Sequence, residues 1–240
     1  FDVRETIRVL LVDGDPSERP YASETDYLLR ALSPRGVASG GRRPGSIVAE
    51  RVSWLDLPAV RLDGFDVVVL ANVADLRAEQ AKALLAFVRA GGGLIVTLGD
   101  KIEPKLLVAR LGSEDVPLLP GVPVRRTRAG EVDGQPSPGW TIAAAGEHPL
   151  NYVVGLIPPP LLDEARVDEL FETPPVEGGR VVLKLAESGL PLLLARPCGQ
   201  GQVLLLTTTA DRAWSNLAIH PLFPMLMHEA VGYLAGQARR

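Results

Sequence analysis

The sequence predicts an α/β domain in which a mostly parallel sheet carries helices on both faces. Short apolar runs without polar alternation are separated by helical patterns, which is typical of strands buried on both faces. These segments follow one another in the order β-α-β-β-α-β over residues 7–98. With 240 residues, 46% of them hydrophobic and 22% charged, the chain has the composition of a globular protein and the length of one large domain or two small ones.

The first part of the chain has the clearest elements. Residues 7–12 form an apolar run that ends at the turn signal Asp13-Gly14-Asp15-Pro16, so a buried strand is expected there. A helix is expected to begin after Ser23, because Asp26 follows three residues later in a near capping box. Further strands are predicted over residues 46–52, 67–70 and 94–98, and an amphipathic helix over 77–90.

The glycine run Gly91–Gly93 precedes a strand, whereas a phosphate-binding loop follows a strand and opens a helix. We therefore interpret it as a helix cap and turn. Residues 113–180 are rich in proline and predict an irregular insertion with short extended segments. Beyond it, a hairpin is expected from residues 181–185 and 190–195, then a strand over 203–207 and a helix over about 221–234.

Charge and composition narrow the classes of partner. The net charge is -4 and aromatic residues make up 5%, so neither an electrostatic nor a base-stacking surface for nucleic acid is indicated. No apolar run reaches the ~18 residues that would span a bilayer. The single cysteine, Cys198, excludes an intramolecular disulfide.

Polar side chains are expected where the predicted strands end. The candidate ligand- or partner-binding edge consists of Asp13, Asp15, Asn72, Asp100, Asp211 and Trp214. In an open α/β sheet, ligands bind outside the carboxyl ends of the strands. Four carboxylates there could bind a cation or raise one another's pKa, but loop aspartates more often cap turns. Trp214 is expected either to line a cleft or to pack as a lid on the sheet edge.

The remaining reactive side chains do not form a recognisable catalytic set. His220 and His228 are eight residues apart, so they cannot share a metal as an i, i+4 pair does. Cys198 has no evident base, and no Gly-x-Ser-x-Gly elbow occurs. We therefore expect no catalytic residue, no metal site and no cofactor.

Two segments carry a resemblance to a known family. One is Val9–Pro16 followed by Tyr21–Leu28, and the other runs from Leu192 through Arg196–Gly201, Thr207–Thr209, Asp211 and Trp214 to Pro221–Pro224 and His228-Glu229. Together they resemble the extracytoplasmic domain of BatA-type aerotolerance membrane proteins, which is similar to class I glutamine amidotransferases. The resemblance implies a flavodoxin-like sheet with helices on both faces, a proline-rich insertion and a β-hairpin.

The resemblance also implies a domain organisation and a location. Residues 1–6 would be the tail of a preceding β module, 7–236 a single α/β domain, and 237–240 a tail towards a membrane segment absent from this chain. The domain would lie on the periplasmic side of a bacterial inner membrane. Its partners would be other proteins of a membrane-associated complex, and it would contact the membrane only through segments outside this chain.

Activity is not expected to accompany the fold. The family's catalytic cysteine would fall at Thr97-Leu98-Gly99-Asp100, where only the Thr97 hydroxyl is available and no base is identifiable. The leading hypothesis is thus a non-catalytic interaction or scaffold domain. The alternatives are a sugar-binding or hydrolytic domain of the trehalose-utilisation type that uses Asp13, Asp15, Asp100 and Asp211, and an amidohydrolase that uses Cys198.

Overall fold

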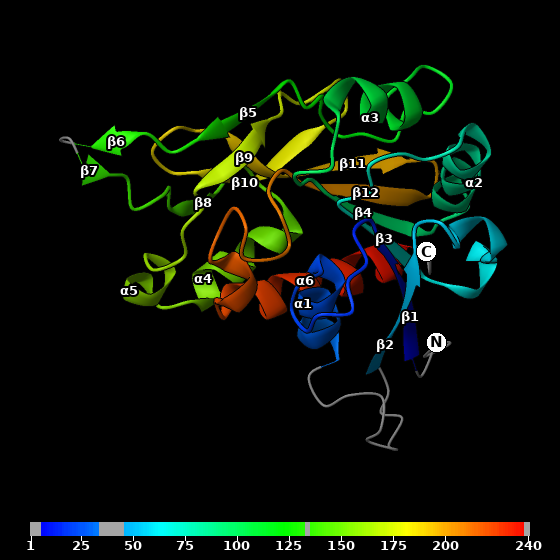
Figure 1. The fold of residues 1–240 in the computed structure, drawn as a ribbon, viewed down its shortest axis with the longest axis horizontal. Helices are drawn as coiled ribbons and strands as arrows, with labels where there is room; N and C mark the ends of the chain where they lie inside the picture. Colours follow the sequence, from blue (N-terminus) through cyan, green and yellow to red (C-terminus); the bar gives the residue numbers. More distant parts are fainter. Residues whose placement is uncertain (1–5, 34–45, 133–134, 238–240) are drawn as a thin grey trace.

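A computed structural model describes residues 6–33, 46–132 and 135–237 of the chain (Figure 1). Residues 1–5 and 238–240 lie outside this range. The expected β-module tail therefore falls outside it except for Thr6, and so does the expected C-terminal tail except for Gln237.

One eight-stranded sheet organises the domain. Its order is β2 (Ser46–Ser53), β1 (Thr6–Asp13), β3 (Val67–Ala71), β4 (Gly93–Thr97), β12 (Gly201–Leu206), β11 (Pro191–Cys198), β10 (Arg180–Leu185) and β8 (Ile142–Ala144). The first five strands pair in parallel, and the last three pair antiparallel with their neighbours. The predicted flavodoxin-like α/β fold with its hairpin is therefore confirmed.

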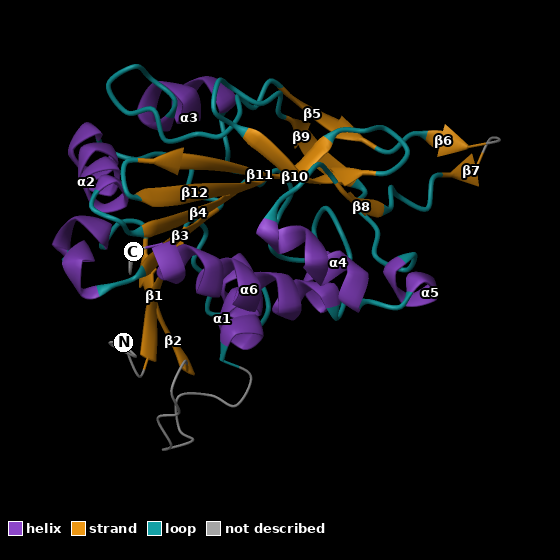
Figure 2. Cartoon of the chain, turned by 180° about the vertical axis from the view of Figure 1, so that it is seen from behind, coloured by secondary structure: helices purple, strands orange, loops and turns teal. Residues whose placement is uncertain are grey.

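Helices cover both faces of this sheet. Helices α1 (Glu24–Leu32) and α6 (Leu222–Gln237) lie on one face, and α2 (Ala78–Arg89) and α3 (Pro104–Leu111) lie on the other (Figure 2). Alternate residues of each parallel strand enter opposite cores: Val9 and Leu11 pack towards α1 and α6, whereas Leu10 and Val12 pack towards α2 and α3. This double burial explains why the strands are apolar without alternation.

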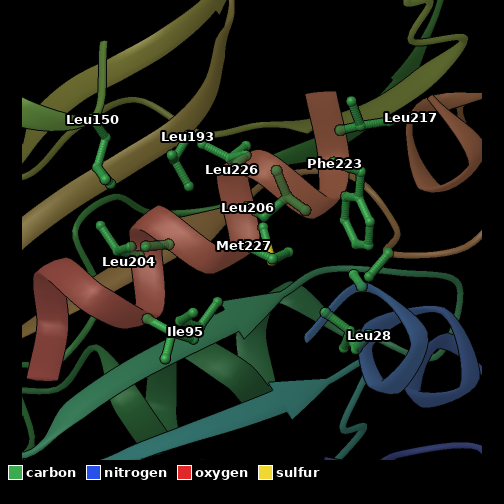
Figure 3. Packing of buried hydrophobic residues seen from close by; sticks show 14 of the residues in the cluster. Leu28, Ile95, Leu150, Leu193, Leu204, Leu206, Leu217, Phe223, Leu226 and Met227 are labelled. Carbon is green, nitrogen blue, oxygen red and sulfur yellow. The ribbon is translucent and has the colours of Figure 1, made fainter. Parts of the chain in front are cut away.

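Helix α6 fills the larger core. In the close view of Figure 3, Phe223 and Met227 face Leu206 of β12, and Leu28 of α1 lies beside them. All four side chains are at most 2% exposed. Burying a side chain of this size stabilises a fold by about 1.5–3 kcal/mol relative to leaving it in water, so α6 is the main anchor of the α1 side of the sheet.

The proline-rich insertion packs on the same sheet. It contributes β8 to the sheet edge, and β5 (Arg125–Arg128) pairs with β9 (Glu169–Glu172) above it. Its other elements are listed together: β6 (Glu131–Val132), β7 (Gln135–Pro136), η3 (Pro149–Asn151), α4 (Tyr152–Leu156) and α5 (Pro159–Leu162). Three short 3-10 turns lie elsewhere, η1 (Leu57–Ala59), η2 (Leu62–Gly64) and η4 (Leu217–Ile219). Helices α3, α4 and α5 were not anticipated from the sequence.

Candidate functional site

The carboxyl ends of β1, β3, β4 and β12 meet at one edge of the sheet. Because these strands are parallel neighbours, the residues that follow them are brought together: Asp13 and Asp15, Asn72, Asp100, and Asp211. Strand β2 lies on one side of β1 in the sheet, and β3 lies on the other side. The direction in which successive strands are added therefore reverses at β1, and the topological switch point lies between β1 and β3. Ligand crevices of open α/β sheets form at this point.

In this protein the switch point is packed shut around Asn72. A Cβ atom on Gly14 would lie 2.0 Å from the Asn72 carbonyl oxygen, and one on Gly99 would lie 2.4 Å from Asn72 Cγ. Asn72 itself has φ 52°, a left-handed conformation that asparagine tolerates better than most residues. Its side-chain amide donates to Asp100 Oδ1 at 2.8 Å and accepts from the Lys101 backbone N–H at 3.1 Å. The loops after β1, β3 and β4 therefore contact one another directly.

Asp13 is occupied by the start of helix α1. It is 2% exposed, and its Oδ2 accepts hydrogen bonds from the hydroxyls of Ser23 and Thr25, both at 2.6 Å. Its Oδ1 accepts from the Asp15 backbone N–H at 3.1 Å. Three donors bind this carboxylate, so Asp13 fixes α1 to β1. This arrangement favours the capping role of a loop aspartate over a direct ligand contact by Asp13.

Asp15 and Asp100 are bridged by a lysine that the sequence analysis did not single out. Lys101 Nζ lies 3.2 Å from Asp15 Oδ2 and 3.4 Å from Asp100 Oδ2. Partial burial acts to raise the pKa of Asp100, but the hydrogen bond from Asn72 and the Lys101 ammonium outweigh it and hold the pKa below its usual value. Asp100 is thus ionised at neutral pH, and both acids are paired with Lys101.

Asp211 and Trp214 follow β12 but do not line a cleft. Asp211 Oδ1 accepts from the Ala213 backbone N–H at 2.8 Å, which is the turn-capping role expected of a loop aspartate. Trp214 is 2% exposed and lies 5.5 Å from the Phe171 ring, with the Arg126 guanidinium 4.3 Å above it. Strand β9 of the insertion therefore covers Trp214, which favours the expected packing on the sheet edge over the lining of a cleft.

The edge also lacks the geometry of a cation site. Within residues 6–33, 46–132 and 135–237, no three histidine, cysteine, aspartate or glutamate side chains are arranged to hold a metal ion. The carboxylates are instead distributed among Ser23, Thr25, Lys101, Asn72 and the backbone.

Glu24 is the residue at this edge that sequence reasoning missed. It is the first residue of α1 and is 5% exposed. Its Oε2 accepts from the Thr97 hydroxyl at 2.8 Å and from the Ala210 backbone N–H at 2.9 Å. Its Oε1 has no hydrogen-bond partner in the part of the chain that the structure describes. One carboxyl group thus joins α1 to the ends of β4 and β12.

The position of Glu24 keeps it protonated. Burial raises its pKa from 4.5 to about 8, against the lowering effect of the hydrogen bonds from Ala210 and Thr97. The nearby charges of Asp211 and Asp100 raise it further. Near pH 7 the side chain is therefore mostly a neutral carboxylic acid. In the sequence it looked like an ordinary acid in a helix start, because only the sheet topology brings the two other strand ends against it.

The other candidate groups stay apart from this edge. Cys198 ends β11, an antiparallel strand, so it lies at the opposite edge, beside Gly201 of β12. Among the described residues no hydrogen bond joins Cys198 to a histidine, and His220 is engaged with the Leu161 carbonyl and the Leu222 backbone N–H. The Cys198 amidohydrolase hypothesis gains no support from this arrangement.

Comparison with known proteins identifies similar folds but no family. No protein-family model matches the sequence, and neither does any curated protein. Among solved structures, the cytoplasmic protein STM3548 from Salmonella typhimurium is 15% identical, with a TM-score of 0.68 over 95% of this chain and 98% of that one. A ThuA-like protein from Bacteroides uniformis is 12% identical, with a TM-score of 0.58 over 98% and 93%.

A β-galactosidase from Rahnella sp. R3 is also similar, at 16% identity and a TM-score of 0.58, but the match covers 95% of this chain and 31% of that enzyme. At these identities the likeness concerns the fold alone. It supports the class I glutamine amidotransferase-like architecture, and nothing among the similar structures supports the narrower resemblance to BatA-type proteins.

The expected periplasmic location is contradicted. STM3548 and a second similar Salmonella structure, STM1381, with a TM-score of 0.60, are both named as cytoplasmic proteins. As a separate observation, none of the helices that the structure describes is long and apolar enough to cross a bilayer.

Proposed function

We propose that this chain is a non-catalytic interaction domain that contacts another protein through the loops at the carboxyl edge of its sheet. The observation that carries the proposal is the hydrogen bonding of that edge. Asp13, Asn72, Asp100 and Glu24 are each engaged by neighbouring groups of the same edge. In an active site, polar side chains are free to contact a substrate, whereas the polar side chains of this edge form hydrogen bonds with one another and with the backbone.

The chemistry of Thr97 supports the same proposal. A hydroxyl nucleophile needs a neighbouring base that takes its proton. The Thr97 hydroxyl instead donates to Glu24, whose pKa of about 8 leaves it mostly protonated near pH 7 and therefore a poor base. Thr97 is also fully buried, so a substrate cannot approach it without displacing α1.

A modular role agrees with one of the comparisons. The match to the β-galactosidase spans 31% of that enzyme, so a domain of this fold forms one part of a longer protein there. A domain without its own chemistry can serve in such a setting by contacting its neighbours. The net charge of -4 favours a protein partner over a nucleic acid.

Photo-crosslinking tests the interaction. A crosslinking residue placed at Asp15 or Asp211, both at the carboxyl edge, is expected to give a defined adduct with one protein in the source cells. The control is the same residue at Gln200, an exposed position in the turn between β11 and β12, at the opposite edge of the sheet. Equal labelling at all three positions, or none at the carboxyl edge, would argue against the proposal.

One observation favours a second candidate, a sugar-binding or hydrolytic domain of the trehalose-utilisation type. A protonated carboxyl such as Glu24 is the state that a general acid requires, and the ThuA-like protein shares the fold. The two candidates differ in a direct assay. Hydrolysis of aryl glycosides or glutamine that is present in the native chain and lost in Glu24→Gln would establish the second candidate and overturn the first.

A further inference from the structure

A groove of about 460 Å³ lies beside the carboxyl edge, between α1 and the connection from β12 to α6. Its main lining residues are Tyr21, Tyr27 and Arg30 on the α1 side, and Ile219, Pro221 and Pro224 on the other. Tyr21 is 50% exposed and Ile219 is 58% exposed, so both walls are open to solvent. Large apolar side chains this exposed, side by side on one surface, mark interaction sites more often than isolated ones do.

Tyr21 is held in this position by specific contacts. Its φ of 60° lies in the left-handed region, which costs conformational energy for any residue with a Cβ. The Tyr21 backbone N–H donates to Asp26 Oδ2 at 2.9 Å, and the Tyr21 ring lies 5.6 Å from the Tyr27 ring at an interplanar angle of 57°. The backbone at Tyr21 is therefore locally strained in a conformation that places its aromatic ring at the surface.

Arg30 gives the groove an unpaired positive charge. It donates to the Tyr21 hydroxyl and lies 5.7 Å from the centre of that ring. Among the described residues no carboxylate pairs with it, because Asp26 is taken by Arg51 at 2.7 Å and by the Tyr21 N–H. Asp211 and Arg212 both act on the nearby Tyr27, the carboxylate raising its pKa and the guanidinium lowering it. A guanidinium has five donors, so Arg30 retains capacity for an incoming carboxylate.

We propose that this groove binds an extended, proline-containing segment of a partner protein, with an acidic residue of that segment paired to Arg30. The inference rests on the proposed interaction function and names its surface and the chemistry of its partner. Aromatic-lined grooves favour polyproline segments, whose extended form is largely ordered before binding. Small-molecule sites enclose most of their ligand. The walls of this groove are exposed at Tyr21 and Ile219, which suits a longer polypeptide segment better than an enclosed small molecule.

Fluorescence anisotropy with the full chain tests this proposal. The probe is a dye-labelled peptide of eight prolines around one central glutamate, and its control has glutamine in place of the glutamate. We expect saturable binding of the glutamate peptide and about two- to fivefold weaker binding of the glutamine peptide, which is the range for one exposed ion pair. Equal binding of the two peptides, or no saturation by about 1 mM, would overturn the proposal.

Variants localise the binding. Arg30→Gln is expected to remove the preference for glutamate, and Ile219→Ser to weaken both peptides about tenfold. Tyr21→Gly removes the aromatic wall while suiting the left-handed backbone, so it should fold and still lose binding. Leu55→Ser is the matched control, because Leu55 is 61% exposed and lies outside the groove. Equal losses in Leu55→Ser and Ile219→Ser would refute the assignment.

Two further outcomes separate this inference from the proposed function. If neither peptide binds while crosslinks at Asp211 persist, the groove is not the docking surface and the interaction function stands. If sedimentation shows a dimer that Ile219→Ser dissociates, the groove holds a second copy of the chain, which overturns the peptide assignment.

Discussion

Replacing Glu24 with glutamine is expected to make the fold more stable at pH 8 and to leave it almost unchanged at pH 5. Glutamine has the shape of the protonated acid and retains a carbonyl oxygen for the Thr97 hydroxyl and the Ala210 N–H. What it removes is the proton equilibrium of a buried group. The stability of the native chain should therefore depend on pH in a way that the variant's does not.

The sign and size follow from the shift in pKa. The folded chain keeps the Glu24 proton up to about pH 8, whereas the unfolded chain releases it near the ordinary value of 4.5. Between these values the unfolded state binds fewer protons, so the free energy of unfolding falls as pH rises. At about 1.4 kcal/mol per pH unit, the loss is roughly 3 kcal/mol at pH 7 and 4–5 kcal/mol at pH 8, beyond which it levels off. Glu24 is buried, so solvent screening does not reduce this estimate.

Urea unfolding followed by circular dichroism at pH 5, 6.5 and 8 measures this difference. The gap between Glu24→Gln and the native chain should widen at each step, to roughly 4 kcal/mol at pH 8. Glu79→Gln, which removes an exposed glutamate from the first turn of α2, controls for the loss of a helix-start acid. Parallel stability curves for the native chain and Glu24→Gln would show that Glu24 is ionised in the folded state, and the reasoning would fail.

Three further changes probe the same edge. Gly14→Ala is expected to cost at least ~3 kcal/mol in urea unfolding, because its Cβ would lie 2.0 Å from the Asn72 carbonyl oxygen; a loss below 1 kcal/mol would mean that the loops separate easily. Thr97→Val removes the hydroxyl that donates to Glu24 and is expected to cost about 1–3 kcal/mol by the same measurement; no change would place the hydrogen bond elsewhere. Trp214→Ala should cost about 3–5 kcal/mol and reduce near-ultraviolet dichroism, whereas a stable variant with altered ligand or partner binding would restore Trp214 to the binding edge.

The sequence was most informative where structure is local. Three elements follow largely from local backbone preferences. These are the strand at the continuous apolar run 7–12, the helix that begins after the cap at Ser23, and the turn at the glycines after residue 90. Five parallel strands then follow almost necessarily, because runs that are apolar on both faces need helices on both sides.

The site was less predictable because its properties depend on distant contacts. The sequence presents Glu24 as an ordinary helix-start acid, and it becomes a neutral acid only because the fold buries it against the ends of β4 and β12. Trp214 is likewise covered by Phe171, and no local pattern records that the insertion folds back over it. The edge aspartates were correctly placed together by topology, but their pairing with Lys101 was not foreseen.

The tight packing around Asn72 has a consequence for sequence change. Because the side chain or backbone of Asn72 fills the space where Gly14 or Gly99 would carry a Cβ, the three positions constrain one another. A relative with a larger residue at Gly99 should also have replaced the asparagine, whose side chain fills that space. A larger residue at Gly14 would instead require the backbone after β3 to shift, and in either relative the loops after β1, β3 and β4 would be free to move apart. Such covariation would distinguish relatives with a closed carboxyl edge from relatives in which the same fold has an open crevice that can bind a substrate.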